Sequence, residues 1–299
     1  MAPEVRLRIV PLVASATEIV HALGLGPYQV GRSHECDYPE QVHGLPVCTR
    51  PRFDVTGSSA EIDRLVRDTL RGAVSIYEVF DSVLEGLQPT HILTQSLCKV
   101  CAVTLEDVEN AMAAGFSTHP RVVALEPDSL EDIWRDIRRV GEACGVADGG
   151  RGLVESLQQR MAEISLIARD GAAPAVACVE WVEPLMEAGH WTPQLIAMAG
   201  AAVTTFQSDP DILIVAPCGF DIGRTAREMY WLEQRTEWND LRAVRRNQVF
   251  LADGNQYFNR PGPRVVETLR ILAEICHPAL FEPTMEGRGW RRYAEAASA

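Results

Sequence analysis

Apolar positions along the chain fall into two patterns that alternate with each other. Short continuous runs, such as His91–Gln95 and Arg121–Glu126, are typical of strands that are buried on both faces. After Ser129, apolar residues recur at 3-4-3-4 spacing, which predicts a helix with Ser129 as its N-cap. The alternation of strands and helices predicts an α/β fold whose sheets are mostly parallel and are covered by helices.

A long helical segment divides this alternation into two parts. The helical period continues through residues 148–170 and stops at Gly171–Pro174. We therefore predict an N-terminal α/β lobe at 1–147, a single bridging helix at 148–170 and a C-terminal α/β lobe at 171–299. The length of 299 residues agrees with two domains of about 100–200 residues each.

Two shorter segments carry predictions that depend on local spacing. Ser15 and Glu18 have the spacing of a capping box, so Ser15 is predicted to cap the helix that follows the first strand. Val203–Phe206 could be a strand, yet the strand at Asp211–Ala216 starts only five residues later. Because a parallel neighbour needs a crossover of about a dozen residues, three alternatives remain open. The two strands pair antiparallel, the first is not a strand, or a helix is missing here.

Polar and aromatic residues gather just after the predicted strands. Ligands of open α/β sheets bind beyond the carboxyl ends of the strands, so these loops predict one ligand cleft between the two lobes. Arg260 could meet a carboxylate or phosphate group of the ligand. The candidate ligand-binding residues are Ser15, Thr17, His34, Glu35, Gln95, Trp181, His190, Trp191, Cys218, Phe220, Asn255, Tyr257, Phe258 and Arg260.

Four of the eight cysteines lie in the same kind of loop. Cys98-x-x-Cys101 resembles half of a metal site, which Cys36 or Cys218 could complete together with His34. The same pair could be a redox pair, although no thioredoxin-like context surrounds it, or part of the wall of a ligand pocket. The candidate metal ligands, for zinc or an iron–sulfur cluster, are therefore Cys36, Cys98, Cys101 and Cys218.

Composition and charge exclude several classes of function. The formal net charge of −13 argues against a nucleic-acid partner, although it leaves room for one local basic pocket. No apolar run approaches the ~18 residues of a membrane helix, so no membrane insertion is expected. Met1–Val10 contains no continuous apolar stretch, so we expect a cytoplasmic protein as given, or a periplasmic or extracytoplasmic one if a leader was removed. No catalytic motif is recognisable, and we expect no enzyme activity.

Several motifs resemble one family of transport proteins. VPLVASATE at 10–18 resembles the opening of the class III periplasmic binding proteins, the helical-backbone receptors for cobalamin, haem and iron–siderophores. Six later motifs resemble the cobalamin-binding subgroup of ABC transporter substrate-binding proteins. They are HECDYP (34–39), SLCKVCAV (96–103), EW (180–181), GHW (189–191), APCGFD (216–221) and DGNQYFNRPGPR (253–264).

The resemblance covers nearly the whole chain and implies both a fold and a function. It implies two α/β lobes that are joined by one long backbone helix and hold a ligand between them. The implied protein is a non-enzymatic binding protein for a corrinoid or related tetrapyrrole, with an ABC permease as its partner. An axial bond from His34 or His190 to the ligand is one implied contact. We expect a monomer.

This chain departs from the family pattern in one segment. Relatives carry a helical stretch with Ser and Trp before the segment that corresponds to Asp209–Asp211, and it is nearly absent here. A second function class also stays open, because a fold does not fix a function. It is a cytosolic metalloprotein or enzyme on the same fold, with a Cys/His site for zinc or an iron–sulfur cluster.

Overall fold

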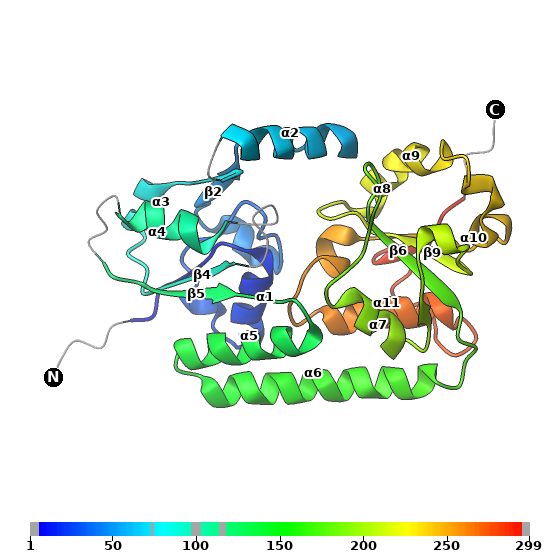
Figure 1. The fold of residues 1–299 in the computed structure, drawn as a ribbon. Coiled ribbons are helices and arrows are strands. Elements are labelled where there is room, and N and C mark those ends of the chain that lie inside the picture. Colours follow the sequence, from blue (N-terminus) through cyan, green and yellow to red (C-terminus); the bar gives the residue numbers. More distant parts are fainter. Residues whose placement is uncertain (1–5, 73–74, 97–102, 114–117, 295–299) are drawn as a thin grey trace. The chain divides into compact units, whose positions relative to one another are not determined.

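The computed structural model describes residues 6–72, 75–96, 103–113 and 118–294, which fall into two units (Figure 1). Unit 1 comprises Met1–Thr56 and Arg64–Ser156, and unit 2 comprises Gly57–Asp63 and Leu157–Ala299. Each unit has its own parallel sheet with helices around it, so the predicted α/β fold class is confirmed. The predicted lobe boundaries at 147 and 171 stay predictions, because one helix crosses the division between the units.

That helix is α6 (Ala147–Ala168), the longest helix of the described chain. Its observed range agrees with the helix predicted at 148–170. It follows α5 (Leu130–Ala143) closely, and the two helices approach each other at a pair of glycines. A Cβ atom on Gly141 would lie 3.1 Å from the Cα atom of Gly150, so the approach requires small residues at this point.

The main sheet of unit 1 has three parallel strands in the order β1-β4-β5. Ile9 pairs with His91 and His91 pairs with Arg121, so the amino ends of the three strands lie level with one another. β2 and β3 form a separate antiparallel pair. The strands are β1 (Ile9–Pro11), β2 (Thr49–Pro51), β3 (Tyr77–Val79), β4 (His91–Gln95) and β5 (Arg121–Leu125). The other helices are α1 (Ala14–Ala22), α3 (Asp81–Gly86) and α4 (Leu105–Ala113); α2 (Ser59–Gly72) starts in unit 2.

Two helix starts in unit 1 test the predictions from local spacing. Ser129 caps α5 as predicted, in a capping box where its hydroxyl accepts from the Asp132 N–H and the Asp132 carboxylate accepts from the Ser129 N–H. The prediction that Ser15 caps the first helix is wrong. α1 starts at Ala14, since the Thr17 N–H already bonds the Val13 carbonyl at 3.3 Å. Ser15 therefore lies inside the helix, where it is buried.

The sheet of unit 2 has six strands, in the order β11-β10-β9-β6-β7 with β8 also paired to β6. Its central pairs are parallel, whereas β7 and β11 run antiparallel to their neighbours. The strands are β6 (Ala175–Trp181), β7 (Met186–Glu187), β8 (Ala202–Val203), β9 (Ile212–Val215), β10 (Val249–Ala252) and β11 (Trp290–Arg292). The helices are α7 (Thr192–Met198), α8 (Ile222–Glu228), α9 (Tyr230–Glu233), α10 (Arg242–Arg245) and α11 (Val265–Cys276).

Two of the three alternatives for the short connection before Asp211 are wrong, and the third, a missing helix, stays a prediction. β8 is a strand, but it pairs in parallel with β6 and does not pair with β9, which lies on the other side of β6. The chain passes the amino end of β6, where the Asp211 N–H bonds the Ala175 carbonyl at 2.8 Å and the Ala175 N–H bonds the Asp211 carboxylate at 3.0 Å. No helical crossover is needed because β8 and β9 are not neighbours.

A buried carboxylate fixes the C-terminal segment of unit 2 to α11. Glu274 is 1% exposed and accepts hydrogen bonds from Arg270 Nε at 2.8 Å and Trp290 Nε1 at 2.9 Å. The Thr284 hydroxyl and N–H and the Met285 N–H donate to it as well. Burial alone would raise the pKa of Glu274, but these hydrogen bonds outweigh burial and lower the pKa below its ordinary value of 4.5.

Replacing Glu274 with Gln should therefore destabilise the protein at neutral pH. The amide group has one acceptor oxygen fewer, so a buried donor loses its partner, and we expect the free energy of unfolding to fall by about 3 kcal/mol in urea denaturation. A carboxyl group with a lowered pKa stabilises the fold above its unfolded pKa, and this contribution is lost as pH falls through the folded pKa. Glu274→Gln should accordingly flatten the pH dependence of stability below the ordinary value of 4.5. Glu155→Gln, on an exposed position of α6, should change neither quantity; equal losses in both variants would contradict this role.

Candidate functional site

A histidine in unit 1 is held by contacts from β2 and β3. His34 Nδ1 lies 2.8 Å from the Thr49 hydroxyl oxygen, which also accepts the His34 backbone N–H at 3.1 Å. The His34 and Tyr77 rings have their centroids 5.5 Å apart. The Tyr77 hydroxyl donates to Glu35 Oε1 at 3.5 Å, and His34 Nε2 lies 3.9 Å from the same oxygen. We call His34, Glu35, Thr49 and Tyr77 the His34 group.

The imidazole of His34 is neutral at physiological pH. Burial, and secondly the positive charge of Arg32, lower the pKa of His34 to about 4. A neutral imidazole carries one proton, so one of its two nitrogens is always an acceptor. When Nδ1 donates to Thr49, the lone pair on Nε2 is available to a ligand.

The other predicted residues of unit 1 lie deeper. Ser15 and Thr17 are buried in α1, and Gln95 is buried at the end of β4. The Thr17 hydroxyl donates to the Cys36 sulfur at 3.0 Å, and burial raises the pKa of the Cys36 thiol. Cys36 is therefore a protonated thiol in the interior, where a thiolate ligand is disfavoured.

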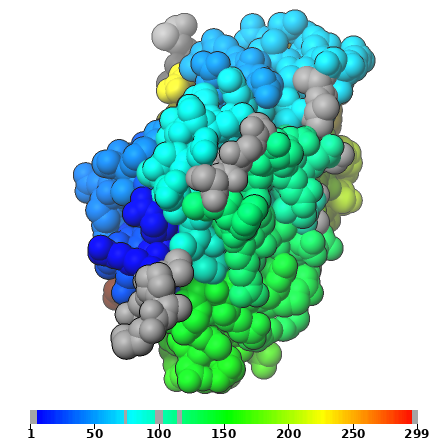
Figure 2. Space-filling view, turned by 90° about the vertical axis from the view of Figure 1, so that its left-hand side faces the viewer, coloured from blue at the N-terminus to red at the C-terminus, as the bar shows by residue number. Residues whose placement is uncertain are grey.

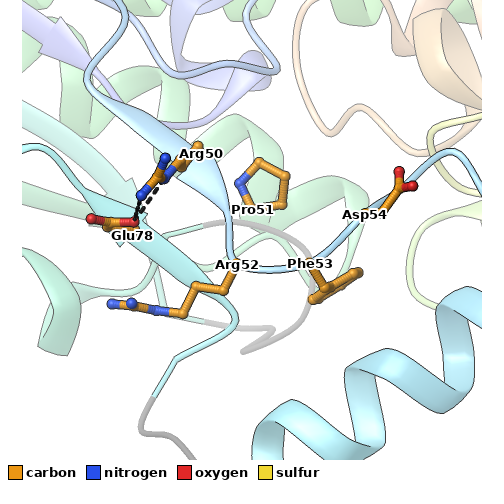
Figure 3. A pocket seen from close by; sticks show the side chains of 6 residues that line it. All are labelled: Arg50, Pro51, Arg52, Phe53, Asp54 and Glu78. Atoms are coloured by element: carbon orange, nitrogen blue, oxygen red, sulfur yellow. Dashed lines mark hydrogen bonds and ion pairs between the residues drawn. The ribbon is translucent and has the colours of Figure 1, made fainter.

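An open pocket of about 370 Å³ is lined by residues 50–54, which begin in β2, and by Glu78 of β3 (Figure 3). Arg50 and Glu78 form an ion pair at 2.7 Å on its wall, where Figure 3 draws both side chains. Arg52 Nε donates to the Tyr77 carbonyl at 3.1 Å, so this arginine is joined through Tyr77 to the His34 group. These arginines could not be predicted from the expectation that ligands bind beyond the carboxyl ends of sheet strands. β2 and β3 lie outside the main sheet, so that expectation does not apply to them.

In unit 2, aromatic residues follow β6 and β9. Trp181 ends β6 and donates from Nε1 to the Glu183 carbonyl at 3.0 Å. Its ring centroid lies 5.2 Å from that of Phe220, which comes after β9. Arg224 stacks on the same phenyl ring, with its guanidinium carbon 3.8 Å from the ring centroid. The rings of Trp181 and Phe220 thus lie together, and their part in ligand binding stays a prediction.

His190 and Trp191 form a second aromatic pair in unit 2. Their rings are stacked with centroids 5.9 Å apart, and His190 is exposed while Trp191 is 8% exposed. His190 has a φ of 52°, in the left-handed region that residues other than glycine rarely occupy. Trp191 Nε1 is buried without a hydrogen-bond partner among the described residues. A strained backbone and an unsatisfied donor side by side are typical of a binding site.

The remaining predicted residues of unit 2 belong to a turn at Gly254–Phe258 and its continuation. Tyr257, Phe258 and Arg260 are buried, and Arg260 Nη2 donates to Asn255 Oδ1 at 3.0 Å. The Gly254 and Asn255 N–H groups both donate to the Phe220 carbonyl. A Cβ atom on Gly254 would lie 2.0 Å from the Pro217 carbonyl oxygen, so only glycine fits here. The turn therefore positions the loop that carries Phe220 and the exposed Cys218.

The predicted cysteine metal site falls partly outside the described residues. Cys98 and Cys101 lie in the 97–102 segment that the structure does not describe. In the rest of the chain, no group of three or more His, Cys, Asp or Glu side chains is placed to hold a metal ion. Likewise, no helix within the described ranges is long and apolar enough to cross a membrane.

Comparison with known proteins identifies the fold. No family model matches the chain. An uncharacterized ABC transporter substrate-binding lipoprotein, YvrC of Bacillus subtilis, is 20% identical over 92% of this chain and 81% of its own length. The apo periplasmic heme-binding protein RhuT from Roseiflexus is 21% identical with a TM-score of 0.67, over 92% of this chain and 99% of that one. The periplasmic vitamin B12 binding protein BtuF of Vibrio cholerae is 16% identical with a TM-score of 0.62, over 91% and 97%. The resemblance to class III periplasmic binding proteins is thus confirmed at the level of the fold.

The low pKa of His34 leads to a testable dependence of stability on pH. Because the unfolded chain binds a proton near the ordinary pKa of 6.5 and the folded chain near 4, stability should fall as pH is lowered between these values. The loss should be on the order of 2–3 kcal/mol. His34→Gln should lack this part of the acid destabilisation, whereas His43→Gln, at an exposed position, should keep it. An imidazole NMR titration that places the pKa of His34 near 6.5 would sink the prediction.

Proposed function

We propose that this chain, which has the fold of the class III periplasmic binding proteins, is a substrate-binding protein that delivers its ligand to an ABC permease. The observation that carries the proposal is the match to such proteins over nearly the whole chain, through both units. The ligand is bound and released unchanged, so no catalytic step is included. An importer takes up its substrate outside the cytoplasmic membrane, and we place the protein on that side.

The ligand that we propose is a corrinoid or a related tetrapyrrole. The solved structures with this fold include proteins described as vitamin B12 binding and heme binding, and both of those ligands are flat macrocycles with a central metal. Trp181, Trp191 and Phe220 offer aromatic surface that suits a flat macrocycle. His34 supports the proposal because a neutral imidazole is a ligand for the central metal.

Polar groups of each unit would orient the macrocycle. Arg52 has its Nε bonded to the Tyr77 carbonyl, which holds the guanidinium group beside the open pocket. Guanidinium groups bind carboxylates in a bidentate manner, so Arg52 would favour a macrocycle with acidic side groups. The Nε1–H of Trp191 would donate a hydrogen bond to an amide or carboxylate oxygen of the ligand.

Titration with cyanocobalamin, cobinamide or haemin should quench tryptophan fluorescence saturably. Trp191→Ala should weaken binding by about 1–3 kcal/mol, the range for loss of a buried aromatic contact at an interface. Trp231→Phe, at a position on α9 that the proposal does not use, should bind normally. Absence of saturable quenching with all three compounds at ~100 μM would remove the proposed ligand class.

The visible spectrum of the bound macrocycle distinguishes a bond from His34 to the central metal from stacking on aromatic rings alone. If His34 binds the central metal, the visible spectrum of the bound macrocycle should change when His34 is replaced by Ala, while that of His43→Ala should equal the wild-type spectrum. Binding that persists in His34→Ala with an unchanged spectrum would show that His34 is not the axial ligand, although the macrocycle is still bound.

A further inference from the structure

Unit 1 has a depression that is lined by cationic residues. It lies at the amino ends of the parallel strands, opposite to their carboxyl ends. It has a volume of about 630 Å³ and combines residues from three distant parts of the sequence. Figure 2 shows this side of unit 1, where dark blue N-terminal residues lie beside cyan and green segments from later in the chain. The lining residues are Arg6, Arg8, Gln88, Pro89, Thr90, Thr118, His119 and Arg121. We call this depression the arginine pocket.

The register of the parallel sheet builds the arginine pocket. Arg8 directly precedes β1, Thr90 directly precedes β4 and Arg121 begins β5, so all three stand at the level amino ends of the strands. The Thr90 N–H bonds the Arg8 carbonyl at 2.9 Å, and the Arg121 N–H bonds the Thr90 carbonyl at 2.9 Å. Arg6 lies two residues before Arg8, on the same side of an extended chain.

The arginine pocket carries positive charge that no carboxylate of the described residues pairs with. Its lining contains no acidic residue, and within the described chain neither Arg6, Arg8 nor Arg121 forms an ion pair with a carboxylate. This is unusual in a chain with a net charge of −13, where 41 acidic residues are available to 28 basic ones. Like charges that are held close together destabilise a fold unless an anion joins them.

Neutral hydrogen-bonding groups complete the arginine pocket. Arg8 Nε donates to the Leu87 carbonyl at 2.7 Å, which fixes the plane of its guanidinium group. The Thr118 hydroxyl oxygen is buried and has no hydrogen-bond partner among the described residues. An orphaned hydroxyl and an oriented guanidinium group in the lining of one pocket are an arrangement that a bound anion with several oxygens would satisfy.

We propose that the arginine pocket binds the phosphate group of an anionic ligand. Three guanidinium groups offer more donors than a single carboxylate can accept, whereas a phosphate has charge close to −2 and oxygens in several directions. The pocket lies at the amino ends of β1, β4 and β5, about 16 Å from the carboxyl ends of β4 and β5 at the rise of a five-residue strand. It is therefore separate from the His34 group, and the proposal goes beyond the proposed function.

The test uses the full chain and two sources of phosphate. Inorganic pyrophosphate is titrated by calorimetry at low and at physiological salt, and sedimentation is measured with phosphatidylcholine vesicles that contain or lack phosphatidylglycerol. The double variant Arg6→Gln/Arg121→Gln removes two guanidinium groups that form no ion pair with a carboxylate of the described residues. The matched control is Arg64→Gln/Arg71→Gln, which removes the same charge from exposed positions on α2.

We expect saturable pyrophosphate binding that weakens about tenfold or more in the pocket variant and less than about twofold in the control. Vesicle binding that needs phosphatidylglycerol and is lost only in the pocket variant would also support the site and would identify a lipid headgroup as the source. Binding in neither assay, or equal weakening in both variants, would overturn the proposal. Macrocycle binding should stay unchanged in the pocket variant, so failure of this proposal and failure of the proposed function are distinguishable.

Discussion

The parallel register of β1, β4 and β5 is the constraint on which the residues at both edges of the main sheet of unit 1 depend. In a parallel sheet all amino ends lie at one edge and all carboxyl ends at the other, so residues that are distant in sequence meet by strand position alone. The pairing of Ile9, His91 and Arg121 places Arg8, Thr90 and Arg121 together at the amino edge. The same pairing places Gln95 beside Leu125 at the other edge. An antiparallel arrangement of these strands would scatter both sets.

Of two ionisable side chains that are wholly or partly buried in this protein, one is neutral and the other is charged. Burial lowers the pKa of His34, and Arg32 adds to the effect, so the ring stays neutral and one nitrogen remains an acceptor. Glu274 is buried more deeply, yet donors from Arg270, Thr284 and Trp290 keep it charged. The difference lies in the partners that replace water, because desolvation favours the neutral form unless donors compensate a carboxylate or acceptors compensate an imidazolium. Glu274 is thus a structural anchor, whereas His34 is a neutral base that is open to a ligand.

The parts of the structure that were predictable from sequence are those that short-range periodicity determines. The strand at His91–Gln95, the Ser129 cap and the helix at 148–170 all depend on residues within a few turns of one another, and all are observed. Ser15 failed as a cap because the helix starts directly after a strand, where tertiary contacts and not the local motif decide the first turn. β6 lies between β8 and β9 in the sheet. The spacing of residues along the chain does not show this strand order, so the position of β8 was not predictable.

The candidate sites likewise contain residues that the sequence pattern could not predict. The loops after strands in each unit were predictable, because their polar and aromatic residues are out of place in ordinary turns. Thr49 and Tyr77, which hold His34, were not predictable, because they come from strands outside the main sheet. The arginine pocket was missed for another reason: ligands were expected at the carboxyl ends of the strands, whereas Arg8, Thr90 and Arg121 stand at the amino ends.

The net charge of the chain does not oppose an anion site in unit 1. At physiological ionic strength the Debye length is about 8 Å, so exposed carboxylates farther away than this contribute little to the potential in the arginine pocket. The potential there is set by charges within that distance, and the described lining supplies three guanidinium groups and no carboxylate. A charge of −13 spread over the whole surface therefore disfavours an extended polyanion such as nucleic acid, which must contact many positions at once. A single phosphate group needs only one pocket. The net negative charge therefore disfavours nucleic acid, whereas the local positive charge of the arginine pocket favours a phosphate group.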